Sequence, residues 1–125
     1  MLVLIIDHSI QIIDRLEELL SEAKHICAIH KAVSYEDAVS IYKKSKPDIV
    51  LLDTSLPANR SVDLMDEIKK MNDATAVIAM SIRTDAHTKE QFVSLGADFF
   101  LDKYYDFEKL PGIIDSIAAN KKKVA

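Results

Sequence analysis

Two hydrophobic patterns alternate along the chain. Short apolar runs, such as the uninterrupted Leu2-Val3-Leu4-Ile5-Ile6, are typical of strands that are buried on both faces. Between these runs, apolar residues recur at intervals of three and four, which is typical of amphipathic helices. The five predicted strands are Leu2–Ile6, 25–33, 48–52, 74–80 and 98–101.

Local signals indicate where the predicted helices begin and end. The segment Ser34-Tyr35-Glu36-Asp37 has the form of a capping box and predicts a helix that continues to about residue 44. Pro47 ends that helix, because the residue before a proline is pushed out of the helical region. Thr84 or Asp85 is expected to cap the fourth helix, and Gly96 is expected to end it in a left-handed conformation.

Five strands that alternate with five helices predict an α/β domain with a parallel sheet. At this size we expect the flavodoxin-like (βα)5 three-layer sandwich with strand order 2-1-3-4-5. The 125 residues suffice for one compact domain, which we place at residues 1–120. Residues 121–125, with three consecutive lysines, are expected to form a basic C-terminal tail.

Composition excludes several classes of function. The formal net charge of −4 argues against broad nucleic-acid binding, and the absence of any run of about eighteen apolar residues argues against a membrane span. The single cysteine, Cys27, excludes an internal disulfide and is predicted to be buried in the second strand. A reducing cytoplasm is the expected location.

Two carboxylates follow apolar strands that the predicted strand order makes neighbours. Asp7 ends the first strand and Asp53 ends the third, so both should lie in the crevice at the carboxyl edge of the sheet. Two neighbouring carboxylates raise each other's pKa unless a cation joins them, and that cation could be Lys103 or Mg²⁺. With the Ser81 hydroxyl at the same edge, the set suits phosphoryl transfer, with Asp53 as the nucleophile that forms an aspartyl phosphate.

Four segments carry a resemblance to a known family. "LIIDHS" resembles an acidic first-strand motif, and "KPDIVLLDTSLP" resembles a phosphoacceptor segment closely. "VIAMS" ends where the family has its switch Ser or Thr, and "GADFFLDK" resembles the fifth strand with its lysine. Over essentially its whole length the chain resembles a response-regulator receiver domain.

The resemblance implies a signalling function rather than turnover of an external substrate. It implies that a histidine kinase or phosphotransfer protein phosphorylates Asp53, and that Asp7, Asp53 and the Ser55 carbonyl hold Mg²⁺. It also implies that Ser81 and Phe100 act as the switch hydroxyl and switch aromatic. A downstream protein partner would bind the face formed by the fourth helix, fifth strand and fifth helix. A homodimer through that face is also possible, and no sequence feature decides it.

The chain departs from the family's usual pattern at four positions. His8 stands where a second acid is usual, so we expect weakened and pH-sensitive Mg²⁺ affinity. Tyr104 stands where proline usually follows the lysine, so a trans bond before it and a shifted loop are expected. Ser61 replaces a usual glycine and should stiffen its loop, and Arg83 occupies a position that affects phosphate lifetime or kinase docking.

Other readings of these residues stay open. The substitutions at His8 and Tyr104 favour a phosphorylation-independent adaptor that binds a protein partner constitutively. Ser81 could be a helix cap, and Phe100 could be an ordinary core residue. A hydrolase or a nucleotide-binding protein is poorly supported, because the chain has no G-x-S-x-G segment and only two glycines.

Overall fold

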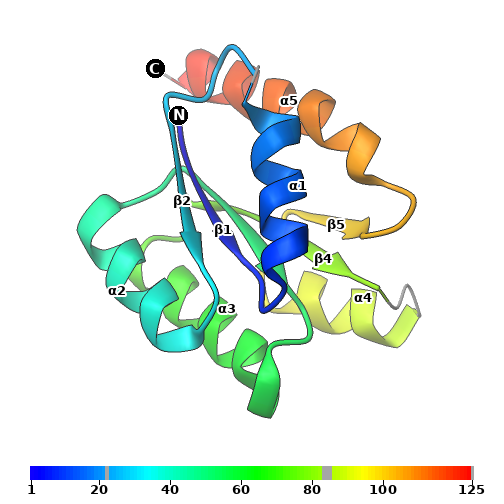
Figure 1. Cartoon of the computed structure of the whole chain (residues 1–125). Helices are drawn as coiled ribbons and strands as arrows, with labels where there is room; N and C mark the ends of the chain where they lie inside the picture. Colours follow the sequence, from blue (N-terminus) through cyan, green and yellow to red (C-terminus); the bar gives the residue numbers. More distant parts are fainter. Residues whose placement is uncertain (22, 83–85, 125) are drawn as a thin grey trace.

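A parallel five-stranded sheet forms the middle layer of the molecule (Figure 1). The computed structural model describes residues 1–21, 23–82 and 86–124. The strand order is β2-β1-β3-β4-β5, which confirms the predicted flavodoxin-like topology. The strands are β1 (Leu2–Ile6), β2 (Ala28–Ala32), β3 (Ile49–Asp53), β4 (Ala76–Ser81) and β5 (Phe99–Asp102).

Helices cover both faces of the sheet and create two hydrophobic cores. One core joins the sheet to α1 and α5, and the other joins it to α2, α3 and α4. The helices are α1 (Ile10–Leu20), α2 (Tyr35–Ser45), α3 (Arg60–Met71), α4 (Ala86–Ser94) and α5 (Leu110–Val124). Short 3-10 turns, η1 (Pro57–Asn59) and η2 (Phe107–Lys109), precede α3 and α5.

Strand β3 shows why the central strands are continuously apolar. Ile49 and Leu51 point into the core with α1 and α5, while Val50 and Leu52 point into the opposite core. All four side chains are fully buried. Each such burial stabilises the fold by roughly 1.5–3 kcal/mol, so both faces of this strand hold the three layers together.

Three strands continue one residue beyond the predicted apolar runs. β3, β4 and β5 end at Asp53, Ser81 and Asp102, which still take part in the sheet: Asp53 is paired with Met80, and Ser81 with Asp102. Pairing persists because the backbone hydrogen bonds of a strand do not depend on an apolar side chain. The polar site residues are thereby held by the sheet itself.

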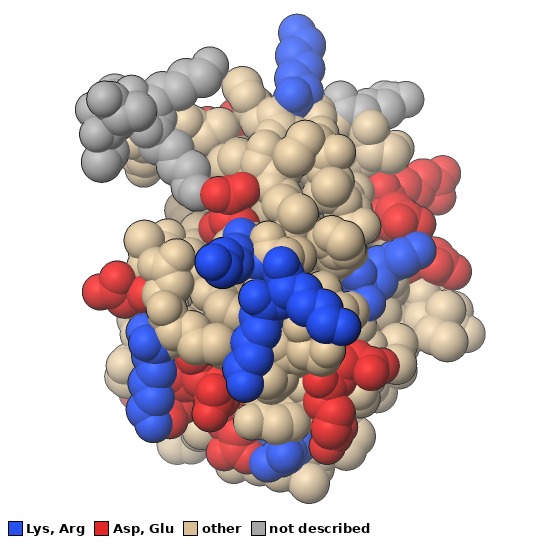
Figure 2. Space-filling model, turned by 90° about the vertical axis from the view of Figure 1, so that its left-hand side faces the viewer, with Lys and Arg blue, Asp and Glu red and all other residues tan. Residues whose placement is uncertain are grey.

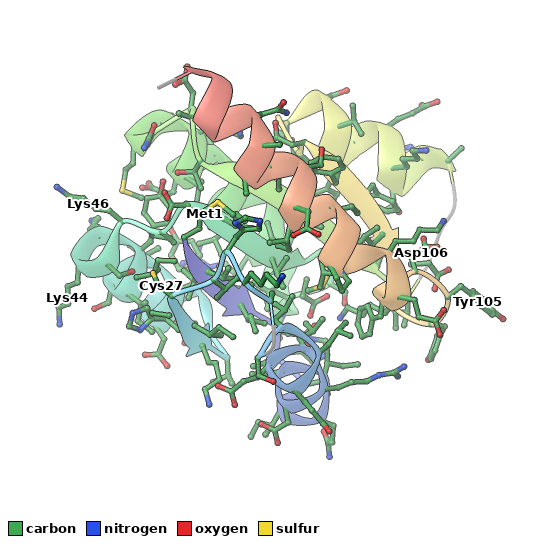
Figure 3. The ribbon with its side chains drawn as sticks, turned by 90° about the horizontal axis from the view of Figure 1, so that it is seen from above. Met1, Cys27, Lys44, Lys46, Tyr105 and Asp106 are labelled. Atoms are coloured by element: carbon green, nitrogen blue, oxygen red, sulfur yellow. The ribbon has the colours of Figure 1, made fainter. Side chains whose placement is uncertain are left out.

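The prediction for Cys27 is wrong. It precedes β2 instead of lying within it, and its side chain is exposed, with Sγ 3.3 Å from the Met1 carbonyl oxygen. β2 is an edge strand with β1 as its one neighbour, so fewer elements cover this part of the chain. Figure 3 labels Cys27 and Met1, whose contact lies at this edge of the sheet.

Helix ends largely follow the sequence signals. The Ser34 hydroxyl accepts a hydrogen bond from the Asp37 backbone N–H at 3.2 Å, as the capping box predicts. Gly96, two residues after α4, adopts a left-handed conformation with φ of 109°. The predicted caps Thr84 and Asp85 lie outside the described residues.

The surface carries both signs of charge. On the face that includes α2, Figure 2 shows Lys and Arg side chains near the middle, bordered by Asp and Glu. Lys43, Lys44 and Lys46 are exposed on and after α2. Across the described ranges, no helix has both the length and the apolar character that crossing a bilayer requires.

Gly96 offers a test of the observed backbone. A Cβ at this position would lie 3.1 Å from the Lys69 side chain, and the left-handed φ is itself unfavourable for alanine. We expect Gly96→Ala to lower the free energy of unfolding by about 1 kcal/mol or more, as measured by urea denaturation. Gly112→Ala is the matched control: nothing lies within 4 Å of its added Cβ, so stability should be unchanged or rise slightly. Equal losses in both variants would contradict the assigned conformation of Gly96.

Candidate functional site

Two buried aspartates meet at the carboxyl edge of the sheet. Asp7 directly follows β1, and Asp53 is the last residue of β3; the two strands are paired neighbours with Ile6 opposite Leu52. Both carboxylates are fully buried. Two buried charges of the same sign are costly unless cations or hydrogen-bond donors accompany them.

Lys103 supplies that cation. Its Nζ lies 2.6 Å from Asp7 Oδ2 and 3.0 Å from Asp53 Oδ1, and its side chain is only 4% exposed. The lysine directly follows β5, and its backbone N–H donates to the Ser81 carbonyl oxygen at 2.9 Å. The predicted convergence of Asp7, Asp53 and Lys103 is therefore observed. Removing one partner from a buried ion pair typically costs about 3–5 kcal/mol, because it leaves the other charge uncompensated.

His8 lies directly against Asp53. Its Nδ1 is 2.5 Å from Asp53 Oδ2 and 3.8 Å from Asp7 Oδ1, while its side chain is 46% exposed. Asp7, His8 and Asp53 each present one potential ligand atom, and these atoms lie within 4.8 Å of one another. The three residues form a cluster that could hold a metal ion.

The two carboxylates differ in their hydrogen bonds and therefore in their pKa. Burial raises the pKa of Asp7 above its ordinary value; the Asp53 charge adds to this effect, and Lys103 opposes it. Burial also acts on Asp53, but there the Ser55 backbone N–H, Lys103 and the Ser55 hydroxyl prevail, so the pKa of Asp53 is lowered. Asp53 is therefore the carboxylate that stays ionised more readily.

Ser55 provides the donors that distinguish Asp53. Its backbone N–H and its Oγ donate to Asp53 Oδ1 at 2.9 Å and 2.8 Å. With Lys103 at 3.0 Å, Oδ1 has three partners, whereas His8 is the partner of Oδ2. The carboxylate is thus oriented, with Oδ1 held by the protein and Oδ2 turned toward the exposed imidazole.

The donor set fits a divalent cation only in part. Carboxylates such as Asp7 and Asp53 are the ligands that Mg²⁺ prefers. An imidazole is better suited to a transition metal. The Lys103 ammonium also offsets part of the negative charge of both carboxylates. The cluster therefore combines two ligands that suit Mg²⁺ with one that suits it poorly.

Ser81 lies beside this cluster. It is buried at the end of β4 and lines a cavity of about 350 Å³ together with Thr54, Ser55, Thr88 and Phe92, among others. Ser81 and the loop after β3, which includes Thr54 and Ser55, therefore line the same cavity.

The remaining predicted site residues lie outside the cluster. Phe100 is half-buried on β5 and packs against the core shared with α2, α3 and α4. Tyr104 is 70% exposed, and no described peptide bond is cis, so the bond before Tyr104 is trans as expected. Arg83 lies outside the described residues.

Two aspartates at the end of β5 and in the loop after it were not among the predicted site residues, although they support the turn that carries Lys103. Asp102 Oδ1 accepts hydrogen bonds from the backbone N–H groups of Tyr104 and Tyr105 at 2.7 Å and 3.2 Å. Asp106 Oδ2 accepts one from the Asp102 N–H at 2.9 Å. Figure 3 shows Tyr105 pointing outward from this loop. The two aspartates hold the turn that carries Lys103, and their spacing around a turn is the signal that was available.

Comparisons with known proteins agree with this geometry. The response regulator receiver domain family matches residues 3–115. The chain is 30% identical to sensory transduction protein LytT of Bacillus anthracis over 97% of its own length, but it spans about half (47%) of that relative. It is 28% identical to chemotaxis protein CheY of Halobacterium salinarum, with 93% of this chain and 92% of the relative covered.

A solved structure shows the same fold. The signal receiver domain of a DNA-binding response regulator from Colwellia psychrerythraea 34H superposes with a TM-score of 0.86 at 25% identity, covering 94% of this chain and 98% of the other. The family match spans nearly the whole chain, and the sheet edge carries the acidic cluster with its lysine. The chain belongs to the response regulator receiver domain family.

Proposed function

We propose that the chain accepts a phosphoryl group on Asp53 from a histidine kinase or phosphotransfer protein, and that this changes its binding to a downstream protein. The contact between Lys103 and the buried, low-pKa Asp53 carries the proposal most directly. A nucleophilic carboxylate must be ionised, and a nearby cation offsets the charge that accumulates on the transferring group.

The hydrogen bonds support different functions for the two Asp53 oxygens. Oδ1 is engaged by Ser55 and Lys103, so Oδ2 is the attacking oxygen once the His8 ring turns aside. Oδ2 forms the new P–O bond, while the P–N bond of a donor phosphohistidine breaks. The leaving imidazole keeps that electron pair and takes up a proton from solvent. Lys103 stays within reach of the phosphoryl oxygens throughout.

Asp7, Asp53 and the Ser55 carbonyl would hold Mg²⁺. When bound, the ion would neutralise charge on the phosphoryl oxygens. His8 offers an imidazole instead of a second acid at this site, so the affinity for Mg²⁺ is weakened.

We further propose that Ser81 and Phe100 act as the switch hydroxyl and switch aromatic. Ser81 lines the cavity beside Ser55, and Phe100 lies on the adjacent strand β5. The downstream partner, or a second copy of the chain, would bind the face of α4, β5 and α5. Arg83 would influence phosphate lifetime or kinase docking.

A phosphorylation-independent adaptor is the second candidate function. One observation favours it: the His8 ring covers Asp53 Oδ2 at 2.5 Å, so the nucleophilic oxygen is occupied. In that case a partner would bind equally well before and after treatment with a phosphodonor.

Replacing the phosphoacceptor tests the proposal directly. Asp53→Asn removes the nucleophile, so ³²P-labelling by acetyl phosphate in the presence of Mg²⁺ should fall to background. Asp66→Asn is the matched control, because Asp66 lies exposed on α3 and should leave labelling unchanged. Equal labelling of Asp53→Asn and wild type would exclude Asp53 as the acceptor.

The opposite pKa shifts predict opposite effects on stability. The raised pKa of Asp7 means that its stabilisation is complete below the unfolded value of about 3.9 and is lost as the pH rises through the folded value. The lowered pKa of Asp53 means that its stabilisation is present above about 3.9 and is lost as the pH falls.

As the pH rises above about 4, the stability of Asp7→Asn relative to wild type should therefore increase, whereas that of Asp53→Asn should decrease as the pH rises to about 4 and then stay level. Urea denaturation followed by circular dichroism, in metal-free buffer, measures both differences. The assignment is wrong if both variants shift in the same direction.

His8 is tested by restoring an acid. His8→Asp should bind Mg²⁺ about tenfold more tightly than wild type, because it adds a hard oxygen ligand and removes the imidazole from Asp53. Isothermal titration with Mg²⁺ measures this. His87→Asp, on the exposed surface of α4, makes the same chemical change away from the site and should leave affinity unchanged. If His8→Asp and wild type bind equally, the ligand argument fails.

A further inference from the structure

Ser61 connects the phosphoacceptor strand to the start of α3. Its side chain is fully buried at the second residue of that helix. The hydroxyl donates to the Asp53 carbonyl oxygen at 2.6 Å and accepts from the Leu56 backbone N–H at 3.0 Å. One hydroxyl therefore satisfies a backbone group at each end of the segment 53–56.

This segment begins a loop with unusual backbone geometry. Ala58 and Asn59 have φ values of 58° and 59°, a left-handed conformation that is unfavourable for alanine and more readily adopted by asparagine. Asn59 caps α3 without a side-chain hydrogen bond. Because Asn59 supplies no side-chain cap, the two Ser61 hydroxyl bonds help to fix how the loop leaves β3.

The bonds of Ser61 bracket Ser55. Asp53 is anchored through its carbonyl and Leu56 through its N–H, so Ser55 is held between two fixed backbone positions. From there its N–H and Oγ both reach Asp53 Oδ1. A chain of contacts thus runs from the Ser61 hydroxyl to the orientation of the phosphoacceptor carboxylate.

We propose that Ser61 is a positioning residue that sets the placement of Ser55 and thereby the orientation of Asp53 and the affinity of the site for a divalent cation. This rests on the proposed function for its effect on phosphorylation, but the effect on loop geometry does not depend on it. Ser61 acts through Ser55 and does not touch the transferring group.

The test compares Ser61→Ala with a matched loss of a buried hydroxyl elsewhere. Tyr42→Phe removes the buried hydrogen bond between Tyr42 and Thr75, which is also 2.6 Å long and joins α2 to the turn before β4. Both variants lose a buried hydroxyl and should lose some stability, whereas only Ser61→Ala should alter the phosphoacceptor loop.

The first measurement uses metal-free protein. Amide hydrogen exchange followed by NMR should show protected Leu56 in wild type, and exchange at least about tenfold faster in Ser61→Ala than in Tyr42→Phe. The Ser55 amide resonance should shift in Ser61→Ala and stay in place in Tyr42→Phe. Fast exchange of Leu56 in wild type overturns the inference even if Ser61→Ala does not fold.

The second measurement is the Mg²⁺ dependence of labelling by acetyl phosphate. Ser61→Ala should raise the Mg²⁺ concentration for half-maximal labelling and lower the maximal rate, each about fivefold or more, while Tyr42→Phe matches wild type. If wild type is labelled and Ser61→Ala has the same half-maximal Mg²⁺ concentration and maximal rate, the inference about Ser61 is wrong while the proposed function stands. Failure of wild type itself to be labelled overturns the proposed function and leaves the exchange measurement to decide whether Ser61 positions the loop.

Discussion

The ion pair between Lys103 and the two buried aspartates is the constraint on which the site depends. Asp7, Asp53 and Lys103 come from β1, β3 and β5, and their charges meet within 3.0 Å at one edge of the sheet. Without the ammonium, two carboxylates with no exposed surface would repel each other in a medium of low dielectric constant. The same arrangement lets one carboxylate stay ionised while the other takes up a proton more readily.

The loops around this ion pair are held by side-chain hydrogen bonds from residues outside the ion pair itself. Ser61 ties both ends of the segment 53–56, and Asp102 ties the turn that carries Lys103. A phosphoacceptor site needs its carboxylate and cation held in a fixed geometry, because misplacement of reacting groups is costly. His8 adds an opposing feature, since it occupies the Asp53 oxygen that our proposal assigns to the reaction.

Much of the fold could be predicted from the chain because its signals are local. Apolar runs and capping residues identified all five strands, and the strand order common for a domain of this size then indicated that Asp7, Asp53 and Lys103 would meet. Cys27 was misplaced because a mixed run near an edge strand has no pattern that separates exposed from buried positions. β3, β4 and β5 each extend one residue beyond the predicted apolar run, because backbone pairing continues at a polar residue.

The amino-acid sequence alone determined the layer architecture and which chemical groups reach the carboxyl edge, since hydrophobic periodicity dictates which faces are buried. Only the tertiary structure decided which oxygen of Asp53 each neighbour contacts, that His8 faces Asp53 more closely than Asp7, and that Ser61 and Asp102 support the loops. These contacts depend on the distances between side chains and backbone groups on different strands and loops. Residue spacing carries no information about such distances, because they are set when the strands and helices pack together.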